Sequence, residues 1–115
     1  MIDAERPKSS GFQPQINAYL SILKGGSGDI PLTGKVTKIG KDPACDIHIS
    51  GFGVGKVALS ISKMPRGYQA SYVGGFKKPR INGEPLKESA KLREFDTIDV
   101  GAMRLQFIYR ESLSV

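Results

Sequence analysis

The sequence predicts an all-β fold, either an open β-sandwich or a small barrel, from three observations. From Ala18 onward, short apolar stretches alternate with turn residues at a spacing of roughly ten residues, a pattern typical of all-β domains. No window keeps the apolar period of about 3.6 residues that a long helix requires. The length of 115 residues is close to the commonest size of a single domain and allows one core without disulfides.

The first strands are short and are separated by glycine-containing turns. A strand over residues 18–23 is followed by a glycine-rich turn and a second strand at residues 30–32. Residues 36–39 and 47–49 lie on either side of a tight turn that carries Lys41.

The middle of the chain gives the clearest strand pattern. Residues 57–62 alternate with period two, so Val57, Leu59 and Ile61 are expected on one face of a strand. A turn containing proline and glycine follows, and the next strand is expected over residues 68–73.

The last third of the chain adds a hairpin and two closing strands. Asn82 and Gly83 form a dipeptide that strongly favours a type I′ hairpin turn. Residues 86–92 are compatible with one helical turn. Two strands, 96–100 and 103–109, are expected to end the domain, joined by a short turn that contains glycine.

The polar N-terminal segment, residues 1–15, contains proline, serine and glycine and is predicted to be a flexible lead-in to a domain over residues 16–112. No apolar run approaches the roughly 20 residues needed to span a bilayer, and the N-terminus lacks the apolar stretch of a signal peptide. A soluble chain in the cytoplasm, on its own or as part of a larger protein, is the expectation.

The composition argues against catalysis and favours an anionic partner. Cys45 and His48 are the only cysteine and histidine, which leaves little material for a disulfide, a zinc site or a histidine-centred triad. No enzyme activity and no cofactor are expected. The formal net charge of +6 favours phosphorylated or acidic proteins, although a lysine excess also serves simply to keep a surface solvated.

Five segments occur in the order in which forkhead-associated (FHA) domains carry their motifs, and the chain resembles that family over about residues 18–109. The segments are Ile39-Gly40-Lys41, Asp46-Ile47-His48-Ile49, Val54-Gly55-Lys56-Val57-Ala58-Leu59-Ser60-Ile61, Ile81-Asn82-Gly83 and Leu92-Arg93-Glu94-Phe95-Asp96-Thr97-Ile98-Asp99-Val100-Gly101. The resemblance implies a two-sheet antiparallel β-sandwich (SMAD/FHA-like) whose loops bind phosphothreonine peptides. Phe95 stands where the family usually has glycine.

The positions that the resemblance assigns to peptide binding are Lys41, Gly55, Lys56, Lys77 and Asn82. At the first three of these positions the family usually has arginine, serine and arginine, and at the fourth an asparagine. Lysine keeps the positive charge but lacks the bidentate guanidinium of arginine, and glycine supplies no hydroxyl. The resemblance therefore implies a degenerate phosphothreonine site.

Two interpretations of the loops stay open at this stage. In one, the domain is a signalling adaptor or scaffold that binds a phosphorylated or acidic protein segment through its loops, with Lys41 and Lys56 as the main contacts. In the other, it binds a partner independently of phosphate as part of a larger assembly. Phe52, between two glycines, is expected either to contact a partner or to fold back on the core.

Two further functions are disfavoured by the residues. Residues 34–42 resemble a phosphate-binding P-loop, but the glycine spacing is too long and Asp42 stands where a hydroxyl residue must bind magnesium. A nucleic-acid-binding barrel would interleave aromatic and cationic side chains on one strand face, and the strand with Tyr68 and Tyr72 has no cation between them. Nucleic acid is therefore an unlikely partner, and no direct insertion into a membrane is expected.

Overall fold

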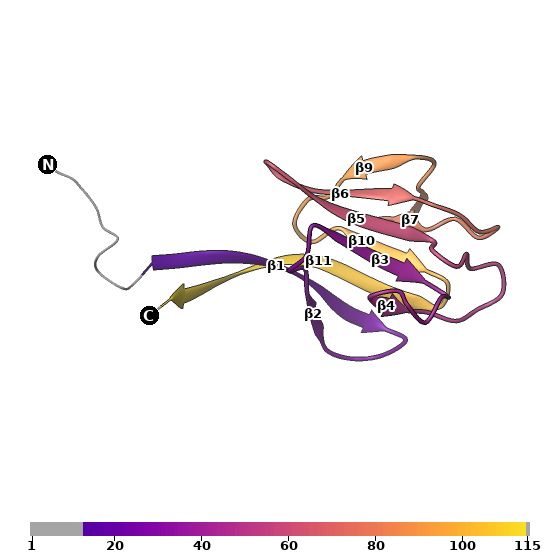
Figure 1. Ribbon diagram of the computed structural model, residues 1–115, viewed down its shortest axis with the longest axis horizontal. Coiled ribbons are helices and arrows are strands. Elements are labelled where there is room, and N and C mark those ends of the chain that lie inside the picture. Colours follow the sequence, from indigo (N-terminus) through magenta and orange to yellow (C-terminus); the bar gives the residue numbers. More distant parts are fainter. Residues whose placement is uncertain (1–12, 115) are drawn as a thin grey trace, which may run out of the picture.

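The computed structural model describes residues 13–114, which form eleven strands and no helix. The strands are β1 (Gln13–Lys24), β2 (Asp29–Pro31), β3 (Val36–Gly40), β4 (Ile47–His48), β5 (Leu59–Met64), β6 (Gly67–Tyr72), β7 (Arg80–Ile81), β8 (Glu84–Pro85), β9 (Ser89–Lys91), β10 (Thr97–Val100) and β11 (Met103–Ser114). They form two sheets that pack face to face (Figure 1), which confirms the predicted sandwich. This part of the chain has no helix that is long and apolar enough to cross a membrane.

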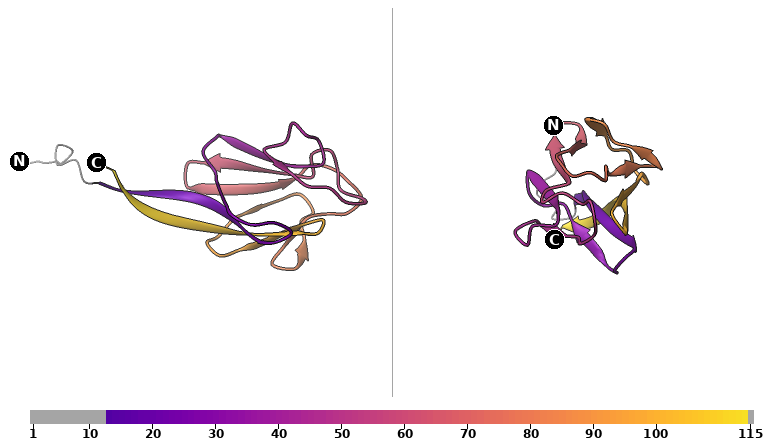
Figure 2. Two further views of the ribbon diagram at one scale, coloured as in Figure 1. Left: turned by 90° about the horizontal axis from the view of Figure 1, so that it is seen from below. Right: turned by 90° about the vertical axis from the view of Figure 1, so that its right-hand side faces the viewer.

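The larger sheet has the strand order β2-β1-β11-β10-β7-β8. Its longest pairing joins β1 to β11, from Gln13 opposite Ser114 to Lys24 opposite Arg104. Figure 2 shows these two strands running side by side beyond the body of the sandwich. Most of the predicted flexible segment, residues 1–15, lies outside the described residues, and β1 already begins at Gln13.

The smaller sheet has the strand order β4-β3-β5-β6-β9. Its pairings are antiparallel except at β3 and β4, which pair in parallel with Ile39 opposite Ile47. The short β4 therefore does not return along β3 as a hairpin partner would. His48 points outward and is exposed, as the alternation around it predicts.

The core lies between the two sheets and follows the period-two pattern of the strands. The fully buried large side chains include Leu20, Ile39, Leu59 and Phe107, each with 0% of its surface exposed. Burying a side chain of this size contributes about 1.5–3 kcal/mol, so these positions dominate the stability of the sandwich. The ring of Tyr68 packs edge-on against Phe107, with centroids 5.5 Å apart.

Residues 86–92, whose sequence is compatible with one helical turn, form no helix. The chain bends at residues 87 and 88 and is then extended in β9, which pairs with β6, with Ala90 opposite Ala70. Leu86 and Leu92 are both buried on either side of β9. The free edge of β6 supplies hydrogen-bond partners for this segment, and that tertiary pairing overrides a weak local preference for helix.

Candidate functional site

Three loops meet at one end of the smaller sheet because of the register of its strands. Ile39 lies opposite Leu59, and Leu59 lies opposite Tyr72, so β3 and β6 end where β5 begins. The loops of residues 41–46, 49–58 and 73–79 therefore extend from the same edge (Figure 1, right-hand side), and we call these three segments the loop end. Gly101 also reaches this end, next to Val54.

Backbone hydrogen bonds connect the three segments of the loop end. The N–H of Lys41 donates to the carbonyl oxygen of Gly55, and the N–H of Asp42 donates to that of Lys56, both at 3.0 Å. The N–H of Lys77 donates to the carbonyl oxygen of Gly53 at 2.9 Å. Because these bonds involve main-chain atoms alone, they fix the loops without using any side chain of the predicted site.

Glycines allow the loops to approach this closely. A Cβ atom at Gly40 would lie 2.2 Å from the carbonyl oxygen of Lys56, and one at Gly55 would lie 2.5 Å from the carbonyl oxygen of Gly74. Both obstructing atoms belong to the backbone, so neither position accepts a side chain without moving a loop. A serine side chain, which the resemblance to FHA domains implies at this position, therefore has no room here.

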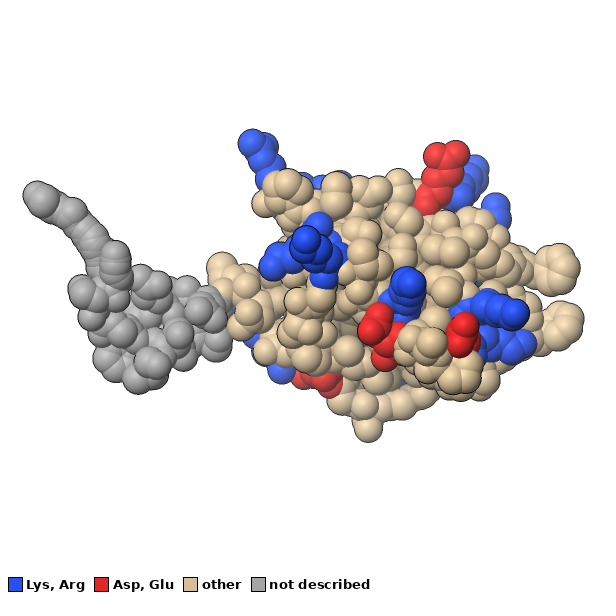
Figure 3. All heavy atoms as spheres, viewed as in Figure 1, with Lys and Arg blue, Asp and Glu red and all other residues tan. Residues whose placement is uncertain are grey.

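Exposed cations project from these fixed loops. Lys41, Lys56 and Lys77 are all exposed, and their side chains form no hydrogen bond or ion pair with any other residue of 13–114. The ammonium of Lys78 lies 5.6 Å from the centroid of the Tyr72 ring. Figure 3 shows cationic side chains grouped at this end, with acidic atoms beside them.

The acidic groups beside the first loop stabilise its turn. The Asp42 carboxylate accepts a hydrogen bond from the backbone N–H of Ala44 at 2.9 Å, and the Asp46 carboxylate accepts one from that of Lys38 at 2.8 Å. The Cys45 thiol donates to the carbonyl oxygen of Lys56 at 3.2 Å. Burial, followed by the charge of Asp42, raises the pKa of this thiol, which argues against a reactive thiolate.

Two aromatic side chains at the loop end point into solvent. Phe52 is 94% exposed and Phe76 is 93% exposed, more than any other large apolar side chain of residues 13–114. Both rings line a cleft of about 550 Å³ together with Lys77. The structure thus shows that Phe52 does not fold back on the core. The role of Phe76 is not apparent from the sequence, although its position after two glycines marks the same kind of aromatic loop tip.

Asn82 lies at the other end of β10 from the Gly101 turn. Its side-chain oxygen accepts a hydrogen bond from the backbone N–H of Thr97, and its side-chain nitrogen donates to the Asp96 carboxylate, both at 2.9 Å. The φ angles of 53° at Asn82 and 87° at Gly83 are those of the predicted type I′ turn. The structure brings Lys41, Gly55, Lys56 and Lys77 together but does not place Asn82 with them.

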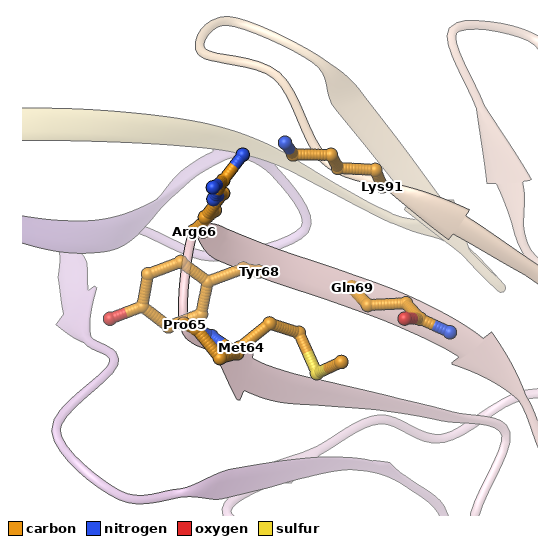
Figure 4. A pocket seen from close by; sticks show the side chains of 7 residues that line it. Met64, Pro65, Arg66, Tyr68, Gln69 and Lys91 are labelled. Atoms are coloured by element: carbon orange, nitrogen blue, oxygen red, sulfur yellow. The ribbon is translucent and has the colours of Figure 1, made fainter.

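A separate pocket of about 360 Å³ lies at the β5–β6 turn, away from the loop end. Figure 4 shows Arg66 and Lys91 above its apolar lining of Met64, Pro65 and Tyr68. The Tyr68 hydroxyl donates to the carbonyl oxygen of Leu32 at 3.5 Å, so this tyrosine is part of the core. Residues 13–114 also contain no group of three or more His, Cys, Asp or Glu placed to hold a metal ion.

Residues 22–111 match the family model described as "Inner membrane component of T3SS, cytoplasmic domain" (Yop-YscD_cpl), where T3SS denotes the type III secretion system. The matched stretch covers well over half of the chain. No curated protein shows significant sequence similarity to the chain.

Solved structures of FHA domains share the fold. The FHA domain of the CT664 protein from Chlamydia trachomatis superposes with a TM-score of 0.72 and 18% identity, covering 80% of this chain and 96% of that one. The N-terminal FHA domain of Rad53p from S. cerevisiae, in complex with a phosphothreonine peptide, gives a TM-score of 0.72 and 16% identity, covering 82% and 94%.

A third similar structure is a longer protein, Mycobacterium tuberculosis EmbR in complex with a low-affinity phosphopeptide. It gives a TM-score of 0.74 at 20% identity, covering 80% of this chain and 24% of EmbR, so the present chain corresponds to about a quarter of that protein. The predicted resemblance to FHA domains is therefore confirmed at the level of the fold.

Proposed function

This chain belongs to the family of the cytoplasmic domain of the T3SS inner membrane component, and we propose that it is a protein-interaction module of the FHA type. In this proposal the loop end binds a phosphorylated or acidic segment of a protein partner on the cytoplasmic side of the inner membrane. The domain acts as an adaptor or scaffold, and no catalysis or cofactor is assigned to it.

The main observation behind the proposal is a group of exposed lysines on loops that main-chain hydrogen bonds join. Lys41, Lys56 and Lys77 come from three different loops that main-chain hydrogen bonds join, and none of the three ammonium groups is paired within residues 13–114. A lysine cluster held in this way attracts an anionic segment without first breaking an internal salt bridge. The phosphopeptides bound to Rad53p and EmbR support a peptide ligand.

The alternative, binding that does not depend on phosphate, is favoured by Gly55. The close approach of Gly74 to Gly55 leaves no space for a serine hydroxyl, and lysine at positions 41 and 56 offers point charges rather than a planar fork. Since a hydrogen bond to a charged group contributes about 1.5–3 kcal/mol, such a site is expected to discriminate less between phosphate and carboxylate. Acidic segments are therefore included in the proposal.

Short peptides with phosphothreonine, threonine or glutamate at a central position, in an otherwise degenerate background, test this proposal. The chain is expected to retain phosphothreonine or glutamate peptides above threonine peptides. The double variant Lys41→Glu/Lys56→Glu is expected to weaken that binding about tenfold or more, since one charge-assisted hydrogen bond contributes at least about 1.4 kcal/mol. Fluorescence anisotropy measures both quantities.

The matched control is Lys35→Glu/Lys63→Glu, which changes two exposed lysines near the start of β3 and the end of β5. Both double variants lower the formal net charge from +6 to +2, so a general charge effect weakens binding equally in the two. Equal weakening, or no retention of any anionic peptide, contradicts the proposal. Equal retention of phosphothreonine and glutamate peptides supports the phosphate-independent form.

A further inference from the structure

The two most exposed aromatic side chains of the described chain occur on different loops of the same end. Phe52 belongs to the loop between β4 and β5, and Phe76 belongs to the loop between β6 and β7. Isolated exposed apolar residues are common on protein surfaces and need no explanation. Two phenylalanines that are almost fully exposed and adjacent in space mark an interaction surface more strongly.

Main-chain contacts hold the two loops together. Lys77 donates its backbone N–H to the carbonyl oxygen of Gly53 at 2.9 Å, and Val54 forms a β-bridge with Gly75. A Cβ atom built at Gly53 would lie 3.7 Å from the Cβ of Phe76, so the stem of Phe76 lies beside the residue that follows Phe52. The backbone thus fixes where the two side chains leave their loops.

The cleft between the loops combines apolar and cationic groups. Phe52 and Phe76 line this cleft of about 550 Å³ together with Lys77. The same two rings line a second hollow, of about 580 Å³, together with Lys41 and Val54. The apolar part suits a large aliphatic or aromatic side chain, and the ammonium groups beside it suit carboxylates next to that side chain. The cleft and the ammonium groups therefore suit two different parts of one ligand segment, an apolar side chain and the carboxylates next to it.

We propose that Phe52 and Phe76, the aromatic pair, bind a large apolar side chain of a partner protein segment in which acidic residues flank that side chain. This inference rests on the proposed function, because the lysines of the loop end supply the electrostatic part of the binding. The aromatic pair then determines specificity, selecting among acidic segments those that carry an apolar residue at the matching position.

A protein segment fits this surface better than an anionic membrane does. Asp42 and Asp46 lie in the loop that carries Lys41, and their carboxylates would oppose a uniformly anionic bilayer surface. A bilayer would also contact the tips of the rings without filling the cleft between them. A chain segment places one side chain in the cleft while its neighbours reach Lys41 and Lys77.

The test uses a peptide library with fixed glutamates on both sides of one degenerate position. The chain is expected to select leucine, isoleucine, methionine or phenylalanine there. Phe52→Ser/Phe76→Ser is expected to lose this selection and to bind the selected peptide about tenfold or more weakly, while still preferring glutamate peptides over neutral ones. Because both rings are exposed, the variant is expected to keep the melting temperature of the parent chain.

Phe95→Ser is the matched control, since Phe95 is 63% exposed and lies in the loop between β9 and β10, away from the cleft. It is expected to leave selection and affinity unchanged. If the chain retains glutamate peptides but shows no preference for an apolar residue, the role of the aromatic pair is wrong and the proposed function stands. If it retains no glutamate peptide, the proposed function is wrong as well. If the chain binds phosphatidylglycerol vesicles tightly and Phe52→Ser/Phe76→Ser loses that binding, the ligand of the aromatic pair is a membrane. That result would overturn this inference.

Discussion

The two ends of the sandwich are built by different means. At the loop end, main-chain hydrogen bonds from Lys41, Asp42 and Lys77 join the loops, and glycines permit the close crossings. At the opposite end, side chains hold the structure: Asn82 bonds Asp96 and Thr97 at the β7–β8 turn. Side chains of Asp42, Asp46 and Cys45 also bond the backbone at the loop end, but the ammonium groups of Lys41, Lys56 and Lys77 have no partner within residues 13–114.

This difference explains how a binding surface can be rigid and still have free side chains. The main-chain bonds that join the loops use neither the three ammonium groups nor the two rings. The backbone of the lysines and of the aromatic pair is then fixed, and a ligand of the ammonium groups does not have to displace a partner within residues 13–114. At the Asn82 turn, by contrast, any ligand of the amide would compete with three hydrogen bonds that the fold uses.

The largest effect is expected for Gly55→Ser, which introduces the residue that FHA domains usually have. The added Cβ would lie 2.5 Å from the carbonyl oxygen of Gly74, so the second and third loops must separate. Overpacking against backbone typically destabilises a protein by about 1–3 kcal/mol, and we expect a value near the upper limit. Chemical denaturation measures the change.

The control for this variant is Gly34→Ser. A Cβ atom at Gly34 would have its nearest neighbour at 3.6 Å, which is an ordinary contact, so the free energy of unfolding is expected to stay nearly constant. If Gly55→Ser is as stable as the parent chain and gains affinity for phosphothreonine peptides, the view of Gly55 as a required close crossing is wrong.

A smaller loss of stability is expected for Asn82→Ala, about 2 kcal/mol. The change removes three side-chain hydrogen bonds, one donated by Asn82 to Asp96 and two donated by the N–H and the hydroxyl of Thr97 to Asn82. Each contributes about 0.5–1.5 kcal/mol, and the change also places alanine at a left-handed φ of 53°. Peptide binding at the loop end is expected to be unchanged, because Asn82 is not part of it. Thermal melting and fluorescence anisotropy on the same sample separate the two effects.

Asn82→Gly distinguishes the causes of that loss, since glycine adopts the left-handed conformation freely and lacks only the amide. It is expected to be more stable than Asn82→Ala. If both variants are as stable as the parent chain but bind the peptide more weakly, Asn82 belongs to the binding site. The contrast between the two ends is then wrong.

The smallest effect is expected at Phe95, which the sequence marks by its departure from the usual glycine. Its φ of 75° lies in the left-handed region, which costs a residue with a side chain about 1–2 kcal/mol. Phe95→Gly relieves this strain, and the greater freedom of glycine in the unfolded chain offsets about 0.4–1 kcal/mol of the gain. A net stabilisation of about 0.5–1 kcal/mol is expected in denaturation experiments.

Phe95→Ala keeps the left-handed strain and is expected to give no stabilisation. A gain of the same size in both variants would mean that the exposed ring, rather than the backbone conformation, destabilises the chain.

The fold was predictable because alternation is a local property of the sequence. Leu59 and Ile61 identify their strand and its buried face from their spacing alone. The parallel pairing of β4 and the extended form of β9 depend on which strand edge is available, and no local pattern carries that information. The Asn82 turn was recognised because its dipeptide requires left-handed φ angles.

The candidate site was predictable only in part. The order of the motifs assigned Lys41 and Lys56 to the binding loops, but it gave no indication that Gly55 is needed for a close crossing with Gly74. Adjacency of Phe52 and Phe76 arises from contacts between two loops that are distant in the sequence. Such contacts appear only when the backbone is assembled.

The most direct test of the account is a map of backbone amide shifts by nuclear magnetic resonance during titration with the tightest-binding glutamate or phosphothreonine peptide of the libraries. The account predicts that the largest changes fall within residues 41–46, 49–58 and 73–79, with little change at Asn82 and Thr97. Changes centred on the β7–β8 turn or on an outer sheet face, with the loop end unaffected, would contradict it.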